Sequence, residues 1–107
     1  MTQRGALVMA SLQGEDGEAR PALIIQSDFL AELDSVVLCP VTSDLRNAVF
    51  RVTVEPNPVN GLRTLSQVMV DKLSTLPRAK LSEPFGHLSE ERMKMVERAL
   101  LLVVGLI

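Results

Sequence analysis

The chain has 107 residues, of which 47% are hydrophobic and 3% aromatic, with a formal net charge of −2 at pH 7. This length predicts a single domain over residues 1–107 with a small hydrophobic core. The slightly acidic composition argues against a surface that is basic all over and grips nucleic acid by charge alone. Cys39 is the one cysteine, so an intrachain disulfide is excluded; with a single histidine, the composition also argues against a dedicated zinc site.

Neither the first nor the last residues read as an export or membrane segment. Residues 1–5 lack the long apolar run of a signal peptide. The apolar run 99–107 is too short to cross a hydrocarbon layer of about 30 Å. We therefore expect a cytoplasmic protein with no membrane contact, whose apolar tail packs in the core or against a second copy.

The first predicted element is an apolar strand over residues 6–12. The segment 13–19 follows as an acidic loop with two glycines, which suits either a plain hairpin turn or a mobile lid. Pro21 cannot donate to a central sheet ladder, so it should mark the start of the next strand. That strand continues as a buried run over residues 22–26.

The middle of the chain predicts two further strands. Asp28 is expected to cap a short helical turn. Residues 35–41 form a strand buried on both faces, and 42–47 a polar turn. Residues 49–55 alternate between polar and apolar side chains, which predicts a strand with one wet face. The loop 56–61 is rich in Pro, Asn and Gly.

The last third of the chain predicts the end of the sheet and a helix. Residues 67–73 read as a strand, 76–81 as one helical turn and 84–88 as a short strand. Ser89 is a predicted N-cap for an amphipathic helix that ends near Gly105. The predicted fold is mainly β (α+β): a small, strongly bent antiparallel sheet or barrel with a C-terminal helix packed on it.

A series of short motifs occurs in an order typical of one protein family. The motifs are Arg4-Gly5, RPALIIQSD at 20–28, PVTS at 40–43, SQVMVDK at 66–72, and GHLS at 86–89 followed by an apolar helix ending in Gly105-Leu106. In this order they resemble the MazF/PemK toxins over nearly the whole chain. The resemblance implies a homodimer with the PemK/CcdB type of fold.

The same resemblance implies the toxin of a type II toxin–antitoxin module. Such a toxin is an mRNA interferase, a sequence-specific endoribonuclease that cuts single-stranded RNA without metal or cofactor. Cleavage runs through the ribose 2′-hydroxyl and leaves a 2′,3′-cyclic phosphate and a 5′-hydroxyl. A cognate antitoxin is implied as the partner that blocks the site.

Arg20 is the first candidate catalytic residue. A guanidinium fork can donate two hydrogen bonds to the non-bridging oxygens of a phosphorane. Arginine stays protonated near pH 7, so we expect transition-state stabilisation, or proton donation to the leaving group, rather than base catalysis. The plainer alternative is a strand-end ion pair with an acid of the preceding loop, such as Glu18. The resemblance favours the catalytic role.

Thr42 and Asp71 complete the catalytic set that the resemblance implies. The alternative for Thr42 is ordinary turn capping toward Asp44. Asp71 either accepts the 2′-hydroxyl proton or orients Arg20, and its plainer alternative is an ion pair with a neighbouring cation. The candidate substrate-binding residues are Ser43, Arg46 and Gln67.

Three positions depart from the usual family pattern, and two reactive residue types have plain explanations. Ala6 and Ser11 stand where relatives carry aspartate, and Met69 where some carry arginine. These departures bear on catalytic strength rather than on the fold. His87 is expected to be structural, and Cys39, inside an apolar strand, is expected to be buried and inert.

Two other functions compete with the ribonuclease. One is a CcdB-like gyrase poison, which has the same fold but no catalysis. A CcdB-like poison has a tail that contains tryptophan, and the present sequence has no tryptophan. Such a poison also lacks the Arg-Pro pair that stands at residues 20–21 here. The other is a weakened member of the MazF/PemK family that binds its antitoxin but no longer cuts.

Overall fold

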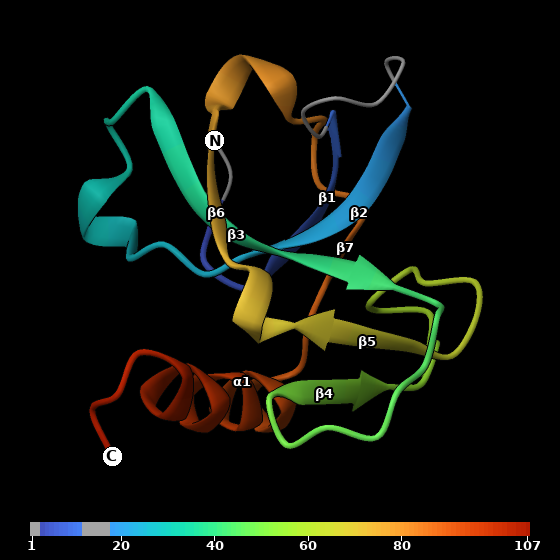
Figure 1. Ribbon diagram of the computed structural model, residues 1–107. Helices are drawn as coiled ribbons and strands as arrows, with labels where there is room; N and C mark the ends of the chain where they lie inside the picture. The colour runs from blue at the N-terminus through green and yellow to red at the C-terminus, as the bar shows by residue number, and fades with distance from the viewer. Residues whose placement is uncertain (1–2, 12–17) are drawn as a thin grey trace.

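The computed structural model describes residues 3–11 and 18–107 (Figure 1). Its strands are β1 (Ala6–Ser11), β2 (Ala19–Ile24), β3 (Ser35–Thr42), β4 (Arg51–Val54), β5 (Ser66–Met69), β6 (Ser74–Pro77) and β7 (Gly86–His87). Three single 3₁₀ turns, η1 (Asp28–Leu30), η2 (Val70–Lys72) and η3 (Arg78–Lys80), and one helix, α1 (Glu90–Val103), complete the described elements. Most of the predicted acidic loop, 13–19, lies outside the described residues.

The strands form one antiparallel sheet in the order β4-β5-β3-β2-β1-β7, with β6 also paired to β3. β3 pairs with three other strands of this sheet. It pairs with β2 along one edge, and with β6 and then β5 along the other. Because β5 and β6 are joined through η2, the chain turns a corner there and the sheet curls (Figure 1). The prediction of a strongly bent antiparallel sheet with one C-terminal helix is confirmed.

Two prolines occupy places in this sheet where no donor is needed. Pro40 lies in β3 between the stretch paired with β6, which ends at Leu38, and the stretch paired with β5, which begins at Val41. Pro21 pairs with β1, but the pairing of β2 with β3 begins only at Ala22. Each proline therefore faces an interruption in the ladder, where a missing N–H is tolerated. Pro21 lies inside β2 rather than at its start, which corrects the predicted boundary.

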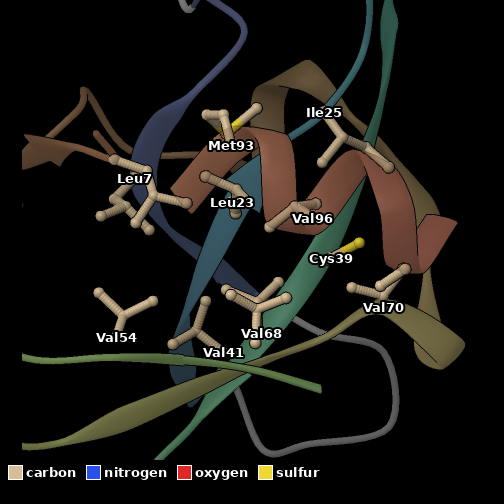
Figure 2. Packing of buried hydrophobic residues seen from close by; sticks show 13 residues of the cluster. Leu7, Leu23, Ile25, Cys39, Val41, Val54, Val68, Val70, Met93 and Val96 are labelled. Atoms are coloured by element: carbon tan, nitrogen blue, oxygen red, sulfur yellow. The ribbon is translucent and has the colours of Figure 1, made fainter. Parts of the chain in front are cut away.

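Successive side chains of β1, β2 and β3 point to opposite faces of the sheet and pack in two separate hydrophobic cores. The larger core lies between the sheet and α1, as Figure 2 shows with Met93 and Val96 of the helix over Leu23 and Val68. The smaller core lies on the opposite face of the same strands and contains Ala6, Val8, Ala10, Ala22, Ile24, Val36 and Leu38. The prediction that the third strand is buried on both faces is confirmed.

The C-terminal helix begins and ends as the sequence predicts. The Ser89 side chain accepts a hydrogen bond from the Arg92 backbone N–H at 3.1 Å, and Glu90 and Glu91 lie in the first turn, where the helix dipole favours acids. Gly105 follows the helix with φ of 81°, a backbone conformation that glycine adopts without strain. α1 packs chiefly on β4 and η2.

Two predicted elements differ from the structure. The predicted strand 67–73 ends at Met69, and the next three residues form η2, so Asp71 lies on a tight turn rather than at a strand end. The predicted helical turn 76–81 is divided between β6 and η3. The first break carries no strong sequence signal, because an apolar residue, Val70, continues the strand pattern into the turn.

The cap of η1 is also corrected. Ser27, not Asp28, is the N-cap, and its hydroxyl accepts from the Phe29 backbone N–H. The Asp28 carboxylate instead accepts from the Arg4 backbone N–H at 2.8 Å. This bond ties the segment that precedes β1 to the segment that follows β2.

Candidate active site

A cleft of about 620 Å³ opens where β2 begins and β3 ends. Its lining residues are Met9, Arg20, Pro21, Val41, Thr42, Ser43, Gly61, Leu62, Arg63, Thr64, Ser66 and Phe85. Among these described residues are two guanidinium groups and four hydroxyl side chains, but no carboxylate. Such a lining suits an anion that accepts several hydrogen bonds, as a phosphodiester does.

Arg20 lies on β2 opposite Ala10 of β1 and is 52% exposed in its side chain. Its Nη2 lies 3.6 Å from the Glu18 Oε1, which is the ion pair anticipated as the plainer alternative. An exposed pair of this kind contributes at most about 1 kcal/mol and is readily exchanged for another anion. The pairing therefore leaves the guanidinium available to a phosphate that enters the cleft.

Thr42 is the last residue of β3, and its hydroxyl has one described partner. The Thr42 Oγ1 accepts from the Asp44 backbone N–H at 3.0 Å, so the predicted turn cap is present. A threonine hydroxyl that accepts in this way keeps its own proton to donate. Turn capping and phosphate binding are therefore compatible at Thr42. Ser43, the next residue, lines the same cleft.

Asp71 and Arg46 lie in a second depression, of about 360 Å³, that shares Thr42 with the cleft. We call this depression the side groove; it is lined by Thr42, Asp44, Arg46, Ala48, Phe50, Arg51, Met69, Asp71 and Lys72. Its charges are largely paired: the Arg46 Nη2 lies 3.2 Å from the Asp44 Oδ2, and the Lys72 Nζ lies 3.5 Å from the Asp71 Oδ2. The structure thus brings Arg20, Thr42 and Ser43 together in the cleft and places Asp71 and Arg46 in the side groove, with Thr42 lining both.

Gln67 lines neither the cleft nor the side groove, because its side chain is 7% exposed and bonded within the chain. Its Oε1 accepts from the Arg46 backbone N–H and from the Arg51 guanidinium, at 2.9 and 3.0 Å. Its Nε2 donates to the Arg46 carbonyl at 2.9 Å and to the Thr53 hydroxyl at 3.2 Å. These contacts pin the segment after Thr42 to β5.

We expect Gln67→Ala to lower the free energy of unfolding by about 2 kcal/mol, since it leaves the Arg46 backbone groups without their buried partners. Chemical denaturation by urea measures this loss. Gln67→Glu serves for comparison: it keeps both acceptor bonds, but a carboxylate oxygen replaces the Nε2 donor and faces the Arg46 carbonyl, so part of the loss should remain. An alanine variant as stable as the native chain would contradict this positioning role.

Cys39 and His87 stay outside the candidate chemistry. Burial raises the pKa of the Cys39 thiol to about 12, and the negative charge of Asp71 acts in the same direction. The His87 side chain is exposed on β7, with its imidazole close to Gly5, and lines neither depression. The expectation of an inert, buried cysteine is consistent with this environment.

The raised thiol pKa predicts a pH dependence of stability. The unfolded chain loses the Cys39 proton near its ordinary pKa of 9.0, whereas the folded chain keeps it to about 12, so stability falls as pH rises through this window. Between pH 8 and pH 10 the loss is about 1 kcal/mol. Urea unfolding at the two pH values should show this loss in the native chain and not in Cys39→Ala. Equal losses in both would contradict it.

No group of three or more His, Cys, Asp or Glu side chains that could hold a metal ion occurs in residues 3–11 and 18–107. In the same part of the chain, no helix is long and apolar enough to cross a membrane.

Comparison with known proteins decides the family. The sequence profile of the "PemK-like, MazF-like toxin of type II toxin-antitoxin system" matches residues 3–104. The chain belongs to this toxin family. A curated relative from Mycolicibacterium smegmatis, a "Probable endoribonuclease MazF", is 40% identical over 106 residues, covering 97% of each chain. The prediction of a MazF-type toxin endoribonuclease is thereby confirmed over that of a gyrase poison.

Solved structures of toxins share the fold. The Mycobacterium tuberculosis toxin MazF-mt6 superposes with a TM-score of 0.82 at 27% identity, covering 94% of this chain and 96% of its own. A mycobacterial endoribonuclease solved with its cognate antitoxin has a TM-score of 0.86 at 23% identity, covering 100% of this chain and 98% of its own. The latter likeness is one of fold alone.

The three departures from the family pattern lie outside the cleft. Ala6 is 2% exposed in the smaller core and lies opposite His87 of β7. Ser11 ends β1, and Met69 pairs with Arg51 and lines the side groove. None of the three therefore removes a side chain from the described lining of the cleft that holds Arg20 and Thr42. No sequence motif joins Arg63, Thr64 or Phe85 to Arg20, so the sequence alone did not place these three residues in the cleft.

Proposed function

We propose that this MazF/PemK family member cuts single-stranded RNA in the cleft that holds Arg20 and Thr42. The observation that carries the proposal is the meeting of a guanidinium with the Thr42 and Ser43 hydroxyls in a cleft whose described lining has no carboxylate. A negative phosphodiester would meet no carboxylate among these lining residues and would displace Glu18 from its ion pair with Arg20. The substrate would be messenger RNA in the cytoplasm.

The proposed reaction is an internal transesterification. The ribose 2′-oxygen loses its proton and attacks phosphorus, the bond from phosphorus to the 5′-oxygen breaks, and that oxygen takes up a proton. The products are a 2′,3′-cyclic phosphate and a 5′-hydroxyl. Arg20 stabilises the charge that develops on the non-bridging oxygens, and Thr42 and Ser43 hold the phosphate by hydrogen bonds. These roles need no metal ion.

Asp71 is proposed as the acceptor of the 2′-hydroxyl proton, acting from the side groove across Thr42. The alternative, that it orients Arg20, is less well supported, since the described ion pairs join Arg20 to Glu18 and Asp71 to Lys72. Arg46 would contact the RNA backbone as it leaves the cleft, and Gln67 would position the Arg46 segment. Asp71→Asn should therefore lower the cleavage rate while leaving RNA affinity within about twofold.

Partners are proposed on two further features. A cognate antitoxin would cover the cleft, with acidic side chains meeting Arg20 and Arg63. A homodimer would bury the apolar side chains exposed at the end of α1 and beyond it, which are Leu101, Leu102, Val104, Leu106 and Ile107. Sedimentation equilibrium of the purified chain tests the dimer.

The experiment that tests the function uses a long single-stranded RNA in EDTA, with the termini mapped by primer extension and kinase labelling. We expect discrete cuts with 5′-hydroxyl ends. A matched oligonucleotide with a single 2′-deoxyribose at the cut position should stay intact, because it lacks the attacking oxygen. Cleavage of the deoxy-substituted oligonucleotide, or no cleavage of any RNA, would overturn the proposal.

A further inference from the structure

Phe85 is the one aromatic residue among the described residues that line the cleft. It precedes β7, is 37% exposed, and belongs to neither hydrophobic core. The ring lies outside both cores, in a cleft otherwise made of guanidinium, hydroxyl and aliphatic groups. It is suited to contact a ligand with a flat apolar face.

The Phe85 backbone is anchored, and its ring packs against a glycine. The Phe85 backbone N–H donates to the Leu7 carbonyl at 2.8 Å, which ties this backbone to the start of β1. Gly61 has φ of 69°, and a Cβ added there would lie 2.6 Å from the Phe85 carbonyl oxygen and 3.1 Å from the Phe85 Cδ1. The ring therefore packs on a glycine backbone that leaves no room for a side chain. Such preorganisation lowers the entropy lost when a ligand binds.

We propose that Phe85 is a stacking platform for one nucleobase next to the phosphate that Arg20 binds. This inference rests on the proposed function, since it takes RNA as the ligand. The cleft then matches a nucleotide part by part: the Arg20 and Arg63 guanidinium groups face phosphates, hydroxyls bond sugar and base edges, and the ring meets the base face. Unstacked bases of single-stranded RNA are recognised on aromatic side chains in this way.

The stacking should be measured as affinity and not as cutting rate. The probe is a fluorescein-labelled heptamer spanning the mapped cut site, with 2′-deoxyribose at the cut position so that it binds without being cleaved. Where no cut is mapped, a random-sequence heptamer pool replaces it. Fluorescence anisotropy gives the dissociation constant. We expect Phe85→Leu to weaken binding by roughly 5- to 150-fold, the range for loss of one base–aromatic stack.

Phe29 offers a matched control within the same chain. Its side chain is 93% exposed on η1 and lines neither depression, so Phe29→Leu makes the same chemical change elsewhere and should leave affinity unchanged. Phe85→Tyr keeps the ring and should bind within about twofold of the native chain. Thermal unfolding of each variant shows whether the fold is kept.

Removing a base from the RNA tests the same contact without altering the protein. An abasic site is placed in turn at each position of the mapped heptamer. At one position the native chain should lose the affinity due to stacking, and the loss at that position should be much smaller with Phe85→Leu. The slope of affinity against salt should stay unchanged in Phe85→Leu, whereas Arg63→Ala should lower it by about 0.7, the value for one phosphate on a single strand.

Each remaining outcome separates the inference from the proposed function. If the native chain cuts RNA but Phe85→Leu binds it normally, or if the abasic penalty persists in that variant, the stacking platform is overturned and the ribonuclease stands. The platform is likewise overturned if Phe85→Leu weakens binding of an antitoxin peptide alone. If the native chain binds the random pool in a Phe85-dependent way but cuts no RNA, the stacking stands and the ribonuclease is overturned.

Discussion

Arg20→Ala is expected to lower kcat for RNA cleavage by roughly 10³-fold, at the upper end of the loss for one donor aimed at a developing oxyanion. The affinity for uncleaved RNA should fall much less, because Arg63 and the cleft hydroxyls still bind the phosphates. Single-turnover cleavage of an oligonucleotide containing the mapped site gives the rate, and anisotropy with the deoxy-substituted heptamer gives the affinity.

The fold should be untouched by this change. The Arg20 side chain is half exposed and its described ion pair is 3.6 Å long, so its removal should alter the free energy of unfolding by less than about 0.5 kcal/mol. Arg20→Lys keeps the charge but loses the planar fork, and an intermediate rate is expected. Arg98→Ala removes an exposed arginine from α1, outside the cleft, and should cut at the native rate. A less than tenfold loss in Arg20→Ala would show that the guanidinium does not act in the transition state.

Gly86→Ala is expected to destabilise the protein by about 3 kcal/mol or more, through overpacking at a place that cannot relax. An added Cβ would lie well inside van der Waals contact with the Asn60 carbonyl and 3.0 Å from the Asn60 Cα. These are backbone atoms, so no side-chain rotation relieves the overlap. One strand of the sheet would have to move away from the loop 56–61.

Asn60 is anchored too firmly for its carbonyl to yield. It is 2% exposed, its Oδ1 accepts from the Asn57 and Leu62 backbone N–H groups, and its Nδ2 donates to the Glu55 carbonyl at 2.9 Å. Its own N–H donates to the Asn57 side chain at 2.7 Å. β7 is held on its other side by pairing with β1. The cleft should be distorted as well, since Gly61 and Phe85 adjoin this contact in the chain.

Gly105→Ala is the control that separates overlap from backbone strain. Gly105 has φ of 81°, but an added Cβ there would meet nothing within 4 Å. Only the left-handed conformation is penalised, at about 1 kcal/mol. Urea midpoints, with the slopes held equal, compare the two variants. If Gly86→Ala is no less stable than Gly105→Ala, the packing argument is wrong.

The elements that could be predicted are those whose pattern is local. The strand predicted over 49–55 is marked by alternation, and the helix by the Ser89 cap and the spacing of Met93 and Val96, so these follow from a few neighbouring residues. The turn at η2 could not be found in this way. Val70 continues the apolar pattern, and the rest of η2 contains no glycine or proline. The turn accompanies a tertiary arrangement instead, since β5 and β6 pair with successive parts of one edge of β3.

The candidate site was predictable in composition and not in arrangement. Arg20 and Thr42 line the same cleft because β2 and β3 are paired neighbours. Two strand-like runs close in sequence, each with a polar end, suggest such a pairing. Whether Asp71 faces Arg20 depends on the curl of the sheet, which no short motif encodes. A glutamine on a strand, such as Gln67, reads as a surface residue until the backbone that it bonds is known. Phe85 enters the cleft only through the pairing of β7 with β1.

That pairing also fixes when the cleft can exist during synthesis of the chain. One edge of β1 pairs with β2, which follows closely in the chain. The other edge of β1 pairs with β7, which is synthesised much later. At roughly 5–20 residues per second, the segment with Phe85 is made several seconds after the one with Arg20. Until then, Arg20 and Thr42 lack the wall formed by Gly61, Arg63 and Phe85. If the proposed site is correct, a ribosome making this toxin is therefore not exposed to a complete cleft on its own nascent chain until synthesis has passed β7.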